Sequence, residues 1–162
     1  MKNTGAYDSQ YFKSSRGFQT NPERAERFSK EIRKYNPERV LDVGCGPGTL
    51  VKLLRSYGIK AYGIDNAKAL KELWKEDYFS IADAQDLPFE DKDFDIVFSS
   101  DFFEHIQHWD IDRVAKEMKR VGKVVIAEIA FQAPLTERQK KYHVTNKPRS
   151  WWEQQLPGVK IL

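Results

Sequence analysis

A short apolar run that leads directly into three closely spaced glycines constrains this chain more than any other feature. Residues 40–49 read VLDVGCGPGT, with glycines at Gly44, Gly46 and Gly48, and apolar residues then recur at helical spacing over residues 50–57. This order predicts a strand, a glycine-rich loop and a helix. Without a Cβ the loop can turn sharply and let a ligand approach its backbone. A tight turn with no ligand is the alternative, but three glycines are more than a turn needs.

The details of this loop argue against a phosphate ligand. The dinucleotide fingerprint needs glycine at the sixth loop position, where this chain has Thr49. The Gly-Lys-Ser/Thr ending of the Walker loop is also absent from the sequence. Asp42 lies just before the loop, and its charge would repel a pyrophosphate but suit an ammonium or sulfonium group. A nicotinamide-dependent dehydrogenase is therefore a disfavoured interpretation.

A second apolar segment, residues 61–65, ends in Asp65. Asp65 follows the loop by about twenty residues, the spacing at which a carboxylate accepts hydrogen bonds from ribose hydroxyls. Capping of the helix expected over residues 67–74 is the alternative role, and either Asp65 or Asn66 can fill it. The two roles are compatible with each other.

Two more predicted strands are followed by acidic residues. Asp83 comes after residues 78–82 and can accept a hydrogen bond from an adenine amino group; a solvated loop acid is the alternative. Residues 94–100 form a fourth predicted strand, which ends in small polar residues before Asp101. Each of these acids therefore lies at the carboxyl end of a strand.

These motifs, in this order and spacing, resemble those of the class I S-adenosylmethionine-dependent methyltransferases. Residues 42–48 match the family's first motif position by position, and residues 63–65 resemble the second. Residues 83–89 are similar to the third motif and residues 94–106 to the fourth. The resemblance implies a methyltransferase that binds S-adenosyl-L-methionine and releases S-adenosyl-L-homocysteine.

The same resemblance implies a cofactor site built from all four motifs. Asp42 and the glycines would hold the methionine moiety, and Asp65 would accept from the ribose hydroxyls. Asp83 would reach the adenine amino group, while Ser100 and Asp101 would lie near the methyl group. The implied cofactor-binding residues are Asp42, Gly44, Gly46, Gly48, Asp65, Asn66, Asp83, Ala84 and Ser100.

A catalytic base is a separate question. The sulfonium is already a good leaving group, so proximity and alignment can supply most of the acceleration. A base is needed only where the acceptor must lose a proton early. The candidates are His143, Asp101 and His105, and His143 is favoured because it lies in a loop expected near the active-site edge. A capping or surface role is the alternative for each histidine.

The sequence also disfavours several kinds of site and substrate. No cluster of cysteines and histidines has metal-ligand spacing, so no metal site is predicted. Residues 99–102 read Ser-Ser-Asp-Phe, which departs from the Asp/Asn-Pro-Pro-Tyr/Phe motif of the methyltransferases that act on amino groups of nucleic-acid bases. We therefore expect an acceptor that is a small molecule rather than a nucleic-acid base. A non-catalytic cofactor-binding subunit that supports a partner protein is the alternative function.

Alternating strands and helices predict a single α/β domain over residues 1–162. The expected fold is Rossmann-like and doubly wound, with a mostly parallel sheet of order 3-2-1-4-5, an abbreviated C-terminal edge and helices on both faces. Residues 1–36 would form a helical cover, residues 37–130 the cofactor-binding core and residues 131–162 the edge. The last, antiparallel strand that the resemblance implies is missing, so either residues 159–162 pair with the fifth strand, or a partner, such as a second copy in a homodimer, covers the edge.

Charge and hydropathy complete the sequence-based predictions. Lys and Arg outnumber Asp and Glu in residues 1–40 and 131–162, and the reverse holds for residues 41–130. A basic cover over the active site would favour an anionic acceptor; solvated helix faces are the alternative interpretation. No apolar run approaches the roughly 20 residues of a membrane span, and the N-terminus has no apolar signal core. A cytoplasmic protein without membrane contact is expected.

Overall fold

The computed structural model describes residues 21–131 and 137–162, and residues 1–20 of the predicted helical cover lie outside this part. The strands are β1 Arg39–Val43, β2 Lys60–Asp65, β3 Phe79–Ile81, β4 Phe94–Ser100, β5 Gly122–Glu128 and β6 Val159–Ile161. The helices are α2 Pro22–Arg33, α3 Thr49–Ser56, α4 Ile111–Val121, α5 Glu137–Tyr142 and α6 Arg149–Gln155, with 3-10 helices η1 Lys68–Glu72 and η2 Phe103–His105.

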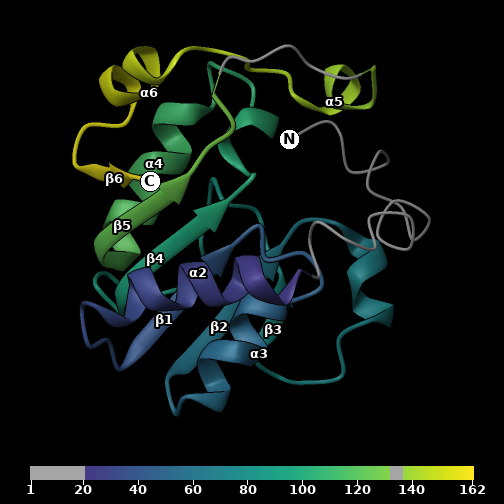
Figure 1. The fold of residues 1–162 in the computed structure, drawn as a ribbon, viewed down its shortest axis with the longest axis vertical. Helices are drawn as coiled ribbons and strands as arrows, with labels where there is room; N and C mark the ends of the chain where they lie inside the picture. The colour runs from purple at the N-terminus through teal and green to yellow at the C-terminus, as the bar shows by residue number, and fades with distance from the viewer. Residues whose placement is uncertain (1–20, 132–136) are drawn as a thin grey trace.

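The strands form one sheet in the order β3-β2-β1-β4-β5-β6, and every pair of neighbours runs parallel. This confirms the predicted Rossmann-like α/β fold and the order of its first five strands. β6 lies in register with β5, with Val159 opposite Val125 and Ile161 opposite Ala127. Direct pairing with the fifth strand is therefore the confirmed alternative for the C-terminal edge, which Figure 1 shows beside α6.

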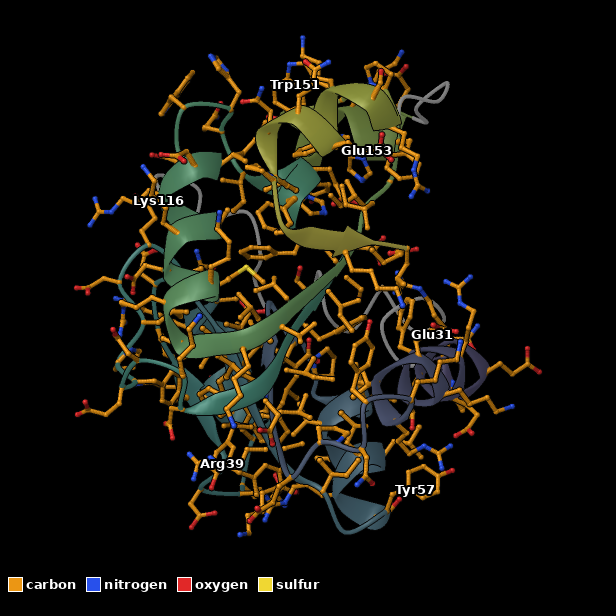
Figure 2. All side chains as sticks on the ribbon, turned by 90° about the vertical axis from the view of Figure 1, so that its left-hand side faces the viewer. Glu31, Arg39, Tyr57, Lys116, Trp151 and Glu153 are labelled. Carbon is orange, nitrogen blue, oxygen red and sulfur yellow. The ribbon has the colours of Figure 1, made fainter. Side chains whose placement is uncertain are left out.

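Successive residues of the strands point to opposite faces of the sheet, and each face has its own apolar core. Val40 and Ile96 pack with residues of α2 and α3. Leu41 and Val97, their neighbours in sequence, pack with residues of α4. Figure 2 shows the two layers, with Glu31 on α2 and Lys116 on α4 at opposite sides of the sheet. Helices therefore cover both faces, as predicted.

Helix α2 begins where the sequence predicted it. The side chain of Asn21 accepts hydrogen bonds from the backbone N–H groups of Glu23 and Arg24, and Pro22 occupies the first turn. Phe28 and Ile32 anchor the helix in the core at 3% and 0% exposure. The cap and the apolar stripe fix where α2 starts and which side faces the sheet.

Three local features differ from the prediction. The helix expected over residues 67–74 is only the short 3-10 helix η1. Helix α5 and the 3-10 helix η2 were not predicted, because neither segment is long enough to show a helical period.

No helix within residues 21–131 and 137–162 combines the length and apolar character needed to cross a membrane.

Candidate functional site

The glycine-rich loop between β1 and α3 has a backbone that other residues would strain. Gly44, Gly46 and Gly48 have φ angles of 76°, 51° and 82°. A Cβ on Gly44 would lie 2.6 Å from Cδ2 of Phe102, and one on Gly48 would overlap the ring of Phe79. The loop therefore needs glycine both for its conformation and for close packing.

Asp42 lies at the base of this loop with only 5% of its surface exposed. Burial and the nearby charge of Asp65 raise its pKa to about 7, while Arg24 opposes the shift. A buried carboxylate near neutral pKa is incompletely balanced by cations, so a ligand with an ammonium or sulfonium group would favour its ionised form. The predicted role of Asp42 toward a cationic ligand stays a prediction.

Asp65, at the end of β2, is held in place by backbone donors. The N–H of Gly46 donates to Oδ2 at 3.1 Å and the N–H of Ala67 donates to Oδ1 at 2.9 Å. Burial still raises the pKa of Asp65. The carboxylate therefore organises the turn before η1 and joins the glycine loop to β2, and each oxygen keeps a second lone pair for a ligand hydroxyl.

Asp83 follows β3 in a tight turn. Its Oδ1 accepts from the N–H of Gln85 at 2.9 Å, and its carbonyl accepts from the N–H of Asp86 at 3.0 Å. Ala84 is only 3% exposed and packs in the core. The side chain of Ala84 is therefore committed to the core, and the residue can offer a ligand only its backbone. Asn66 is half-buried directly after Asp65.

One pocket joins the first turn of α2, the glycine-rich loop and the end of β4. Predicted residues that line it are Asp42, Gly44, Gly46, Ser100 and Asp101. Gly48, Asp65, Asn66, Asp83 and Ala84 are not among its lining residues. The pocket thus gathers all the residues expected near the methionine and methyl groups except Gly48, whereas those expected near the ribose and adenine lie outside its lining.

Sequence reasoning missed the cation of this pocket, Arg24 on α2. Its Nη2 forms ion pairs with Oδ2 of Asp101 and, at 2.8 Å, with Oε2 of Glu128 at the end of β5. Burial raises the pKa of Asp101 to about 6, and Arg24 opposes that rise. The cap at Asn21 predicts the start of α2 but carries no signal for its docking at the carboxyl ends of β4 and β5.

The three candidate bases divide into two groups. Asp101 lines the pocket, whereas His105 and His143 pack against each other, with ring centroids 4.8 Å apart and planes at 79°. Nδ1 of His105 lies 3.0 Å from the carbonyl oxygen of Tyr142, and burial lowers the pKa of His105 to about 4. Burial also lowers the pKa of His143. Both histidines are thus weaker bases than a free imidazole.

Glu104, between Asp101 and His105 in sequence, was missed by the prediction. Its side chain is fully buried, and Oε1 accepts from the N–H of Ala130 at 3.1 Å. Burial, with the charge of Asp101, raises its pKa to about 8. The apolar neighbours Phe103 and Ile106 are compatible with burial, but the sequence gives no signal for the partners of Glu104, because they come from the chain after β5 and after α5.

Comparison with known proteins places this geometry in a family. Residues 41–124 match the methyltransferase domain family. The chain is 35% identical over 100 residues to norajmaline N-methyltransferase of Rauvolfia serpentina, an alignment that covers 53% of this chain and 32% of that protein. It is 32% identical over 114 residues to demethylmenaquinone methyltransferase of Thermotoga maritima, with 64% and 49% covered. The chain thus spans about a third to a half of the length of these curated relatives.

Solved structures share the fold. A SAM-dependent methyltransferase from Archaeoglobus fulgidus superposes with a TM-score of 0.72 at 21% identity, covering 90% of this chain and 72% of that one. The family match includes the glycine-rich loop, Asp65, Asp83 and the whole of β4. On the strength of that match and the matching site, the chain belongs to the methyltransferase domain family, within the class I S-adenosylmethionine-dependent methyltransferases.

Proposed function

We propose that this chain binds S-adenosyl-L-methionine at the pocket and transfers its methyl group to a small-molecule acceptor. The observation that carries the proposal is the pocket at the carboxyl ends of β1 and β4, with Asp42 and Asp101 on its walls. Ligands of open α/β sheets bind at this edge, near the point where the strand order reverses. The relatives named above are methyltransferases of small molecules by their names, which favours a small-molecule acceptor.

The charges of the pocket suit the methionine end of the cofactor. Asp42 would face its ammonium and sulfonium groups, while Arg24 supplies the cation that a carboxylate needs. Asp65 would accept from the ribose hydroxyls, and Asp83 with the backbone of Ala84 would contact the adenine. Gly44, Gly46 and Gly48 would leave room for the ligand, with Ser100 and Asn66 at its sides.

The transfer step needs little beyond alignment. The acceptor atom attacks the methyl carbon in line, the C–S bond breaks, and sulfur keeps the electron pair as the thioether of S-adenosyl-L-homocysteine. Where the acceptor carries a proton, Asp101 is the candidate that lines the pocket and can take it. With a pKa raised to about 6, Asp101 is mostly ionised at neutral pH and a stronger base than an ordinary carboxylate.

The expected preference for an anionic acceptor stays part of the proposal. Arg24 lines the pocket, and the side chain of Arg27, one turn along α2, is 64% exposed. Arg24 is already paired with Asp101 and Glu128, so the exposed side chain of Arg27 is the feature that supports this preference. The cytoplasmic location and the homodimer stay predictions.

Calorimetric titration with S-adenosyl-L-homocysteine tests cofactor binding directly. We expect saturable 1:1 binding by the wild-type chain, and a loss of at least about 50-fold for Asp65→Ala, which removes charge-assisted hydrogen bonds. Asp77→Ala, an exposed acid outside the site, is the matched control and should bind normally. A wild-type chain that does not bind would overturn the proposal.

A second measurement separates the enzyme from the non-catalytic subunit. Release of S-adenosyl-L-homocysteine from S-adenosyl-L-methionine is followed with a panel of hydroxylated, amino and anionic small molecules. Turnover that depends on an acceptor supports the enzyme. Tight cofactor binding with no turnover on any acceptor favours the subunit that supports a partner protein.

A further inference from the structure

Three side chains that can ligate a metal ion meet beside the pocket. Glu104 and His105 belong to η2, and His143 lies in the segment between α5 and α6. One ligand atom from each side chain lies within 4.8 Å of the other two. The sequence carries no metal-ligand spacing here, because His143 joins the pair only through the fold.

Glu104 has an unused oxygen in this cluster. Its Oε2 is buried and has no hydrogen-bond partner among residues 21–131 and 137–162, although Oε1 is bonded to Ala130. A buried carboxylate oxygen without a partner is energetically costly. A cation bound at this place would supply the missing partner and remove that cost.

Each histidine offers one ring nitrogen to the cluster. The carbonyl of Tyr142 lies 3.0 Å from Nδ1 of His105, which favours the tautomer with its proton on Nδ1 and a lone pair on Nε2. Nδ1 of His143 is buried without a hydrogen-bond partner in the described part of the chain.

The backbone fixes the two halves of the cluster to each other. The N–H of Thr145 donates to the carbonyl of Glu104 at 3.1 Å, and Oγ1 of Thr145 donates to the carbonyl of Ile106 at 2.7 Å. Thr145 itself is only 3% exposed. With Tyr142 also in contact with His105, the segment that carries His143 is tied to η2 on both sides, so the cluster is largely preorganised.

We propose that Glu104, His105 and His143 form a binding site for a divalent first-row transition ion of the zinc class. Two imidazoles and one carboxylate suit such an ion, whereas Mg²⁺ and Ca²⁺ prefer oxygen ligands alone. A tetrahedral ion with bonds of about 2.1 Å holds its ligand atoms about 3.4 Å apart, so small side-chain rotations close the site. Three protein ligands leave one coordination position for water or another ligand.

The site would lie next to the methyl-transfer pocket. The charge of Asp101, which lines that pocket, raises the pKa of Glu104. The inference does not rest on the proposed function, because metal binding is measured without cofactor or acceptor.

The test is calorimetric titration of the EDTA-treated, dialysed chain with zinc chloride at pH 7. We expect 1:1 binding, because the three side chains supply one ligand atom each to one ion. Glu104→Gln should bind at least about 100-fold more weakly, and His143→Ala should lose affinity similarly. His108→Ala, the exposed third histidine, is the control and should bind like wild type.

Two further readouts keep the result decisive. Glu104→Gln keeps the hydrogen bond from Ala130, and circular dichroism with thermal melts verifies that it folds. Cobalt(II) should give tetrahedral d–d absorption in wild type and in Cys45→Ser, which excludes a thiolate site. Absence of 1:1 zinc binding at micromolar concentration, equal affinity in wild type and Glu104→Gln, or tighter binding of Mg²⁺ than of Zn²⁺ would each overturn the inference.

Discussion

Acidic side chains at the two ends of the carboxyl edge of the sheet differ in how their oxygens are hydrogen-bonded. At the β1–β2 end, both oxygens of Asp65 accept from backbone N–H groups of its own turn and of the glycine loop. At the β4–β5 end, Glu104 has an unpartnered oxygen, and Asp101 and Glu128 share the guanidinium of Arg24. At the first end, nearby backbone groups satisfy the carboxylate of Asp65. At the second end, the partners of the acids come from distant elements, and one oxygen of Glu104 has none among the described residues.

The largest expected effect comes from the β1–β2 end, with Gly48→Ala. The substitution strains a φ of 82° and pushes a Cβ into Phe79. We expect a loss of about 3 kcal/mol in unfolding free energy from backbone strain and overpacking, or about 10 °C in Tm, and loss of cofactor binding.

Gly58→Ala is the matched control for that prediction. Gly58 has a nearly identical φ of 81°, but a Cβ there would meet nothing within 4 Å. It should cost only about 1 kcal/mol and leave cofactor binding intact. Equal Tm losses in the two variants would mean that strain alone, and not packing against Phe79, makes glycine necessary in the loop.

At the β4–β5 end, Glu104→Gln probes the unpartnered carboxyl group. Its pKa is raised to about 8 in the folded chain, so the folded state binds a proton more tightly than the unfolded state does. The wild type should therefore lose stability as pH rises from about 5 to 8.5, and the variant should not. We expect the variant to gain about 2 kcal/mol relative to wild type between about pH 6.5 and 8.5, measured by thermal melts in EDTA.

Glu117→Gln makes the same chemical change with the opposite expectation. The hydrogen bond from Arg120 lowers the pKa of Glu117 in the folded chain. The ionised carboxylate therefore stabilises the folded state above the unfolded pKa, and this stabilisation is lost only as the pH falls below that value. This variant should be destabilised by a nearly constant amount between pH 5 and 8.5. A flat difference between wild type and Glu104→Gln over that range would show that Glu104 ionises as in solution.

The same contrast explains what could be predicted from the sequence. The glycine loop and Asp65 were predicted because their hydrogen bonds link residues within one strand–loop–helix–strand unit, and the strand alternation fixed the parallel order. Arg24 and Glu104 were missed because their partners are 77 or more and 26 residues away, respectively. A lone charged residue looks solvated in a sequence, and the burial of these two side chains depends on elements that are distant along the chain.

Asp42 gives a smaller effect that belongs to the β1–β2 end. Its pKa is about 7 in the free chain, and a bound ammonium group should lower it, so S-adenosyl-L-homocysteine should bind more tightly as pH rises. We expect about a tenfold gain in affinity from pH 6 to pH 8. Calorimetry at both pH values measures it, with Asp101→Asn retaining the gain and Asp42→Asn losing it. A gain that survives in Asp42→Asn would assign the pH dependence to another group.

Arg24→Gln, the smallest effect, tests whether α2 holds the β4–β5 end together. Without the guanidinium, Asp101 and Glu128 face each other in a partly buried site, and Asp101 should take up a proton more readily. Because the Arg24 side chain is 15% exposed and Asp101 can be neutralised by protonation, we expect a loss of only about 1 kcal/mol at pH 7. Arg27→Gln, with its side chain 64% exposed and 3.6 Å from Glu128, should cost no more than about 0.3 kcal/mol. Equal small losses at pH 7 and at pH 5, where Asp101 is mostly protonated, would mean that the ion pair with Asp101 does not help to hold α2. The two ends of the edge would then differ only in their hydrogen bonds.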